Sequence, residues 1–204
     1  INEIEKIAKN KNKKINIGIR LNPNINAKTL KKISTGKTED KFGIEELNFL
    51  KILKKFKDSK YLKIKCLSVH IGSQITDYRP YTKMITVIDK VIKKSGHKFD
   101  FIDLGGGMGV KYDVKTKSLN YKKYNLIIKK FLKKNNVKII FEPGRAIIAD
   151  TAVLLTKIIY IKKTRKKNFI ILDAGMNDLI RPALYGSIPQ IIPLKKKNKV
   201  INKI

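Results

Sequence analysis

The chain has 204 residues, of which 42% are hydrophobic, and this is enough to bury the core of one or two domains. Its net charge of +31 would suit a nucleic-acid-binding module, but the lysines are spread over the whole length and aromatic residues are not interleaved with the basic runs. We therefore interpret the charge as a solvated surface, and a basic nucleic-acid-binding module is the less favoured alternative.

Cysteine content and hydropathy narrow the class of protein further. Cys66 is the only cysteine, which excludes an internal disulfide and indicates a reducing compartment. No apolar stretch is long enough to span a bilayer. We expect a cytoplasmic protein with neither a membrane span nor a metal site. Because the chain begins with Ile1 rather than Met and ends at Ile204 in mid-pattern, we also expect a fragment.

Short apolar runs alternate with amphipathic segments over the first 149 residues. Short, mostly apolar runs are typical of parallel strands buried on both faces. We predict strands at 15–21, 63–70, 99–104 and 137–141, and helices at 44–56, 81–94 and 121–134. Such alternation indicates a (β/α) barrel or an open doubly wound sheet. Polar motifs follow successive strands at their carboxyl ends, where barrel enzymes place their chemistry, and this favours the barrel.

The pattern changes after residue 149. A β-branched run at 151–162 is followed by a basic turn at 162–167 and an apolar run at 169–172, with no helical pattern between them. Consecutive strands predict an antiparallel β unit. We therefore predict two domains: a partial (β/α) barrel at 1–149 and the start of a C-terminal β domain at 150–204.

Two turns after predicted strands carry residues suited to binding a charged ligand. The glycines at 105–107 would let backbone N–H groups approach a phosphate, although a tight turn explains them equally well. Glu142 and Arg145 flank a Pro-Gly turn. The acid could hold a pyridine nitrogen protonated and the guanidinium could bind phosphate or carboxylate, or the two could form a surface ion pair.

Two further segments are dense in polar groups. In 70–74, the His70 imidazole could stack on a flat ring and Ser73 could bond a phosphate, although a histidine at a strand end is more often structural. The segment 173–186 carries two acids, an amide, Arg181 and Tyr185 directly after an apolar run. Only five of the 47 basic residues are Arg. Three of them, Arg20, Arg145 and Arg181, lie in motif-like segments, which indicates a need for the planar guanidinium at these positions.

Together these motifs resemble the fold-type III pyridoxal-phosphate decarboxylases, whose barrels are of the alanine-racemase-like type. The glycine run and the glutamate turn are shared by ornithine and arginine decarboxylases of that group. The segment 173–186 and Gln74 resemble diaminopimelate decarboxylases in particular, and so do the short motifs at 20–23, 33–36 and 41–43. The resemblance covers the chain from about residue 15 to residue 190.

The resemblance implies pyridoxal 5'-phosphate as the cofactor and a role for each matching residue. His70 and Glu142 would be catalytic, since His70 stacks on the cofactor ring and Glu142 pairs with its pyridine nitrogen. The other implied contacts are those of Ser73, Gly105, Gly106, Gly107, Gly144 and Arg145 with the cofactor, and those of Arg145, Arg181 and Tyr185 with the substrate.

The implied reaction is decarboxylation of meso-2,6-diaminopimelate to L-lysine and CO2, the last step of lysine biosynthesis, in a homodimer. The alternative is another decarboxylase of this fold, acting on ornithine, arginine or carboxynorspermidine. Arg181 with Tyr185 would repel the cationic distal ends of those substrates. The family's Schiff-base lysine and proton-donor cysteine match no residue of 1–204, so we expect the chain to be inactive alone.

Overall fold

The computed structural model describes residues 1–27, 36, 41–112, 117–186 and 189–194. These residues form two compact units. Unit 1 comprises the described residues within Ile1–Val110 and Ser118–Thr151, and unit 2 those within Lys111–Lys117 and Ala152–Ile204.

Unit 1 is built on a parallel sheet of four strands, β1 (Ile15–Arg20), β2 (Leu62–Ser68), β3 (Phe101–Asp103) and β4 (Lys138–Ile140). The strands pair in the order β1-β2-β3-β4, so each strand lies beside the next one in the chain and the order never reverses. A doubly wound sheet reverses at its switch point, whereas a barrel proceeds in one direction. The sheet therefore confirms the predicted partial (β/α) barrel.

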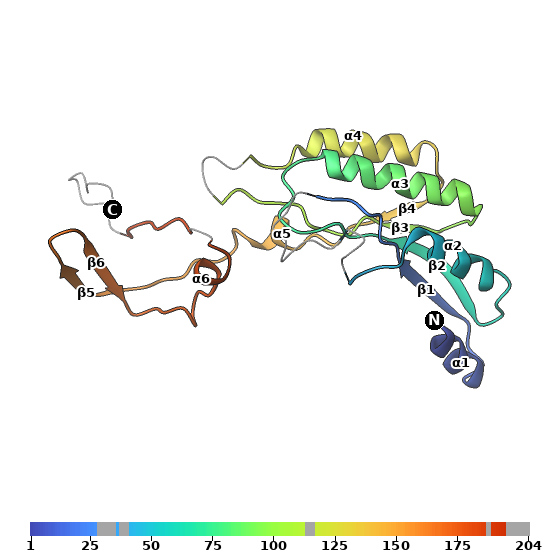
Figure 1. Cartoon of the computed structure of the whole chain (residues 1–204), viewed down its shortest axis with the longest axis horizontal. Helices are drawn as coiled ribbons and strands as arrows, with labels where there is room; N and C mark the ends of the chain where they lie inside the picture. The colour runs from blue at the N-terminus through green and yellow to red at the C-terminus, as the bar shows by residue number, and fades with distance from the viewer. Residues whose placement is uncertain (28–35, 37–40, 113–116, 187–188, 195–204) are drawn as a thin grey trace. The chain divides into compact units, whose positions relative to one another are not determined.

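Helices connect the strands of this sheet. They are α2 (Glu46–Lys55), α3 (Arg79–Ser95) and α4 (Tyr121–Leu132), and α3 and α4 lie side by side along the sheet (Figure 1). Local signals set their ends. Pro80 stands in the first turn of α3, and Gly96 ends that helix with φ +60°. The Asn120 side chain caps α4 by accepting a hydrogen bond from the Lys123 backbone N–H at 3.0 Å.

The core of unit 1 lies between the sheet and these helices. Leu67 and Ile102 of neighbouring strands are fully buried, as are Phe49 of α2 and Met84 and Ile88 of α3. Burial of apolar side chains at this scale is the main stabilising contribution to such a fold. It also fixes the strand register, and with it the positions of the loops that follow each strand.

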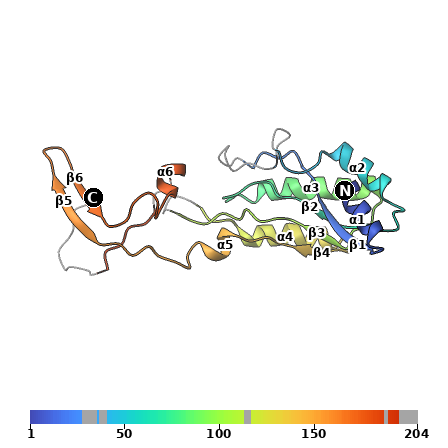
Figure 2. The ribbon, with the colours of Figure 1, turned by 90° about the horizontal axis from the view of Figure 1, so that it is seen from below.

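Unit 2 contains an antiparallel hairpin of β5 (Ile158–Lys163) and β6 (Asn168–Leu172), which confirms the predicted β unit (Figure 2). The turn is closed by the Thr164 hydroxyl, which donates to the Lys167 carbonyl at 2.5 Å. The strand predicted from residue 151 begins only at Ile158, because β6 has five residues and offers no partner to the earlier part of the run.

Three helices were not predicted: α1 (Asn2–Asn10), α5 (Arg145–Ile148) and α6 (Arg181–Tyr185). The last two span four and five residues, which is too short for a helical period to show in a sequence. In α1 only Ala8 is buried, whereas Ile4 and Ile7 of its apolar face are exposed. Among the helices of the described ranges, none combines the length and apolar character needed to cross a membrane.

Candidate active site

The candidate site of unit 1 is formed by the loops that follow β2, β3 and β4. Because the strands are parallel, these loops leave the same edge of the sheet. Backbone hydrogen bonds join them directly. Ile75 donates to the Gly107 carbonyl and accepts from Gly109, each at 2.9 Å, and Glu142 donates to the Gly105 carbonyl at 2.9 Å.

The three predicted phosphate-binding glycines lie where these loops touch. A β-carbon on Gly106 would stand 2.0 Å from the Glu142 carbonyl oxygen, and one on Gly107 would stand 2.1 Å from that of Gly72. Gly105 adopts φ +64°, where its β-carbon would stand 2.5 Å from the Val69 carbonyl oxygen. Close contact between protein backbones therefore explains the glycines by itself, and phosphate binding stays a prediction. Glycine is required because no side chain fits between the loops.

His70 is fixed in one neutral form by this packing. The Gly106 backbone N–H donates to His70 Nδ1 at 3.2 Å, so Nδ1 carries no proton and the neutral ring is protonated on Nε2. Burial lowers the pKa of His70, and the positive charge of Arg20 lowers it further, against the opposing effect of Asp103. His70 is therefore a neutral, half-buried ring at the end of β2.

Arg20 is one of the arginines that the Lys-rich composition makes informative, although it was not among the predicted site residues. It ends β1, its Nη2 donates to the His70 carbonyl at 3.1 Å, and its guanidinium lies 5.0 Å from the centre of the Phe42 ring. Burial lowers the pKa of Arg20, while the carboxylates of Glu142 and Asp103 oppose that shift. The scarcity of Arg in a Lys-rich chain marks this position in the sequence, and the structure adds its contact with His70.

Arg145, the first residue of α5, meets two residues of the loop after β2. Its Nη2 donates to Ser73 Oγ at 2.8 Å and its Nη1 donates to Gln74 Oε1 at 3.0 Å. The alternative of a surface ion pair with Glu142 is not found: the ion pairs among the described residues involve neither Arg145 nor Glu142. Gly144 faces open space, since a β-carbon added there would meet no atom within 4 Å. Arg145 thus donates to two neutral acceptors, Ser73 and Gln74, and neither of them balances the charge of its guanidinium.

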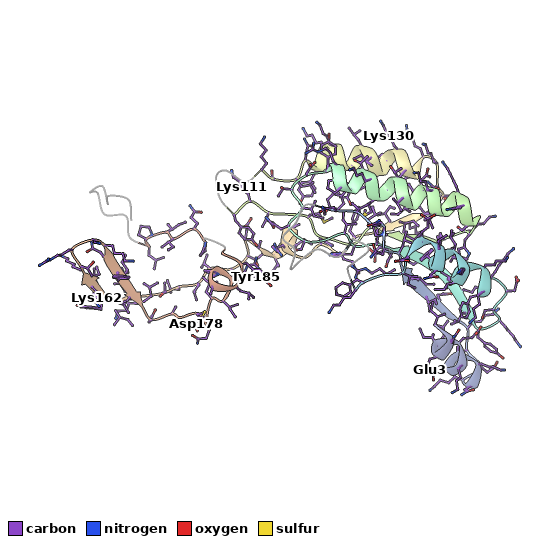
Figure 3. All side chains as sticks on the ribbon, viewed as in Figure 1. Glu3, Lys111, Lys130, Lys162, Asp178 and Tyr185 are labelled. Atoms are coloured by element: carbon purple, nitrogen blue, oxygen red, sulfur yellow. The ribbon has the colours of Figure 1, made fainter. Side chains whose placement is uncertain are left out.

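The predicted substrate residues lie in unit 2. Arg181 begins α6, and its guanidinium lies 5.2 Å from the centre of the Tyr185 ring and 5.8 Å from that of Tyr112 (Tyr185 is labelled in Figure 3). Tyr112 was not predicted, because nothing in the local pattern links it to a segment about seventy residues away. Asp173 accepts from Thr156 and Lys157, and Asp178 accepts from Gly175. These two acids therefore organise their own turns.

Comparison with known proteins agrees with this arrangement. Residues 1–149 match the family described as pyridoxal-dependent decarboxylase, pyridoxal binding domain. The chain is 41% identical over 198 residues to the diaminopimelate decarboxylase of Zymomonas mobilis, covering 94% of this chain and 47% of that protein. It superposes on the crystal structure of the Helicobacter pylori diaminopimelate decarboxylase complexed with L-lysine with a TM-score of 0.86 at 37% identity, covering 97% of this chain and 50% of the other.

A third similarity is to the M. jannaschii diaminopimelate decarboxylase, in a crystal structure with L-lysine, with a TM-score of 0.83 at 34% identity over 96% of this chain and 48% of that one. The chain spans about half the length of the curated relatives it matches. The family match covers the whole parallel sheet and the three loops at its edge. The chain belongs to the pyridoxal-dependent decarboxylase family.

Proposed function

We propose that the full-length protein is a diaminopimelate decarboxylase, which converts meso-2,6-diaminopimelate to L-lysine and CO2. The observation that carries the proposal is the contact of the loop after β4, which carries Glu142 and Arg145, with the loops after β2 and β3. The neutral His70 ring stands at the same edge of the sheet and accepts from Gly106. The choice of substrate is supported by relatives of that name, which match 94% and 98% of the chain.

The residues of unit 1 fit pyridoxal 5'-phosphate, which combines a flat ring, a basic ring nitrogen and a phosphate. When bound, the cofactor supplies an electron sink for the pair left by departing CO2. His70 would stack on the ring, and its neutral state leaves the positive charge to the ring nitrogen. Glu142 would keep that nitrogen protonated. The phosphate would be held by the Arg145 guanidinium together with Ser73, Gly107 and Gly144. Gly105 and Gly106 would shape the loop beside it, because their backbone N–H groups already donate to Asp103 and His70.

The residues of unit 2 would bind the substrate end remote from the departing CO2. Arg181 offers two parallel N–H donors to a carboxylate, and the Tyr185 hydroxyl, four residues along, would donate to the same group. The Tyr112 ring would hold the Arg181 guanidinium in place through a cation–π contact. A cationic distal group, as in ornithine or arginine, would meet repulsion there.

We also propose the organisation of the full-length protein. A pyridoxal-binding domain at 1–149 is supported by the range of the family match, and a C-terminal β domain from 150 is supported by the antiparallel hairpin. We propose a cytoplasmic homodimer that binds neither nucleic acid nor membrane.

The experiment measures CO2 release by the full-length protein from meso-diaminopimelate, ornithine, arginine and carboxynorspermidine. We expect turnover of meso-diaminopimelate alone, with L-lysine as product. Glu142→Gln should keep the cofactor yet lose more than about tenfold in turnover, or about 1.4 kcal/mol of barrier, since an amide cannot retain the pyridinium proton. The matched control is Glu3→Gln, in the exposed first turn of α1. Release of CO2 from ornithine or arginine in preference would reassign the substrate.

A further inference from the structure

Gln74 is the residue at which all three strand-end loops of the candidate site meet. Its Nε2 donates to the Val110 carbonyl at 2.6 Å, and its Oε1 accepts from the Val110 N–H at 3.3 Å. The same Oε1 accepts from Arg145 Nη1 at 3.0 Å. One side chain on the loop after β2 therefore holds Val110 of the loop after β3 and the first residue of α5.

The orientation of the Gln74 amide follows from its partners. A backbone N–H and a guanidinium N–H can only donate, so the atom between them must be the amide oxygen. The Val110 carbonyl can only accept, so the atom that meets it must be the amide nitrogen. A reversed amide would lose all three hydrogen bonds, and the side chain has a single stable arrangement.

The backbone of Gln74 is in an uncommon conformation. Its φ is +62°, in the left-handed region that Gly and Asn enter most readily, and it is one of three non-glycine residues with positive φ in the described part of the chain. A residue chosen for the turn alone would be Gly or Asn. The longer amide of Gln is what reaches Val110 and Arg145.

We infer that Gln74 is a positioning residue that aims the Arg145 guanidinium at an oxyanion group. This inference rests on the proposed function. Gln74 is suited to this role because it is neutral: Gln74 Oε1 and Ser73 Oγ fix two guanidinium nitrogens without cancelling the charge. A carboxylate in the same place would hold Arg145 equally well but would compete with the bound anion.

The oxyanion is either the cofactor phosphate or a carboxylate of the substrate, and the measurement separates them. The dissociation constant of pyridoxal 5'-phosphate, compared with that of pyridoxal without its phosphate, reports on the phosphate. The Michaelis constant for the amino-acid substrate reports on the carboxylate. In the full-length holoenzyme we expect Gln74→Asn to raise one of these two constants by about tenfold, or about 1.4 kcal/mol. Asn accepts the backbone conformation, but its side chain is one methylene shorter.

A double-mutant cycle with Arg145→Lys tests whether Gln74 acts through Arg145. Lys offers no second nitrogen to be aligned, so adding Gln74→Asn to Arg145→Lys should change the same constant by less than about twofold. Gln74→Gly, which also suits φ +62°, carries the same test if the Asn variant does not fold. Gln190→Asn, at the chain's only other glutamine, is the matched control and should change neither constant.

Equal losses in the wild-type and Arg145→Lys backgrounds, or no loss in either constant, would overturn the inference. The dissociation constants of the cofactor can be measured for all variants of the cycle without any turnover. If meso-diaminopimelate is not decarboxylated but Gln74 and Arg145 are coupled in cofactor binding, the proposed substrate fails and the inference stands. If meso-diaminopimelate is decarboxylated as proposed but Gln74 and Arg145 are not coupled, the proposed function stands and the inference about Gln74 fails.

Discussion

The two units use similar apolar strands with opposite results. In unit 1, Leu67 and Ile102 are fully buried beneath the helices that connect the strands. In unit 2, every residue of β5 and β6 is exposed, although β6 reads Asn-Phe-Ile-Ile-Leu. A sheet buries a face only when a second layer covers it, and a two-stranded hairpin has no layer of its own. Hydrophobic sequence thus predicts a strand, but burial depends on what packs against it.

The candidate site residues differ in the same way. Those of unit 1 are held by hydrogen bonds between loops that a buried sheet positions, whereas Arg181 of unit 2 lies against two tyrosine rings. We expect the geometry of the first group to withstand substitution at the surface and that of the second to depend on a few contacts. Substitutions in each unit test this difference.

The largest expected effect is on stability and separates the units directly. Ile102→Ala should reduce the free energy of unfolding of the 204-residue chain by about 2–5 kcal/mol, because it leaves a cavity in the core. Ile161→Ala in β5 should cost less than about 1 kcal/mol, since Ile161 is 47% exposed. Denaturant unfolding measures both. An Ile161 cost as large as that of Ile102 would show that another surface covers β5.

The next effect is on substrate binding. Arg181→Lys in the full-length protein should raise the Michaelis constant for meso-diaminopimelate about ten- to a hundredfold, since losing one charge-assisted hydrogen bond costs about 1.5–3 kcal/mol. Cofactor affinity should stay the same. The control is Arg165→Lys, at the exposed turn of the same unit. An unchanged Michaelis constant with a lower melting temperature would make Arg181 a structural residue.

A smaller effect tests the packing of the loops in unit 1. Gly106→Ala should cost about 1–3 kcal/mol of stability, because the added methyl overlaps the Glu142 carbonyl and the loops must separate. Gly144→Ala, with no atom within 4 Å of the new methyl, should change stability by less than about 0.5 kcal/mol. Thermal unfolding compares the two variants. Equal costs would mean that the loops separate freely and do not fix Glu142.

The smallest effect is the pH dependence contributed by His70. Its pKa is lowered in the folded state, so the unfolded chain binds the proton more readily. The stability contributed by neutral His70 is fully present above the ordinary histidine pKa of about 6.5 and is lost as the pH falls toward the lower folded value. Unfolding of wild type and His70→Asn, followed from about pH 8 to about pH 5 across that value, should therefore converge on the acid side. Parallel curves would contradict a buried neutral ring.

Much of the fold follows from local sequence. The alternation of apolar and amphipathic runs predicts the four parallel strands and the three helices between them, with shifts of a few residues at the ends. The short helices α5 and α6 escape prediction because they are shorter than the period that would reveal them. The exposure of β5 and β6 could not be predicted either, because the burial of a strand depends on which other elements pack against it.

The sequence by itself determined which residues stand at strand ends, among them His70, Glu142 and Arg145, and that their chemistry suits a charged ring cofactor. Only the tertiary structure decided which of them meet. It pairs Arg145 with Ser73 and Gln74 rather than with Glu142, its near neighbour in the chain. It also explains the glycines at 105–107 by backbone contacts with loops distant in the sequence. Spacing along a chain sets local geometry, whereas these contacts depend on the register of a packed sheet.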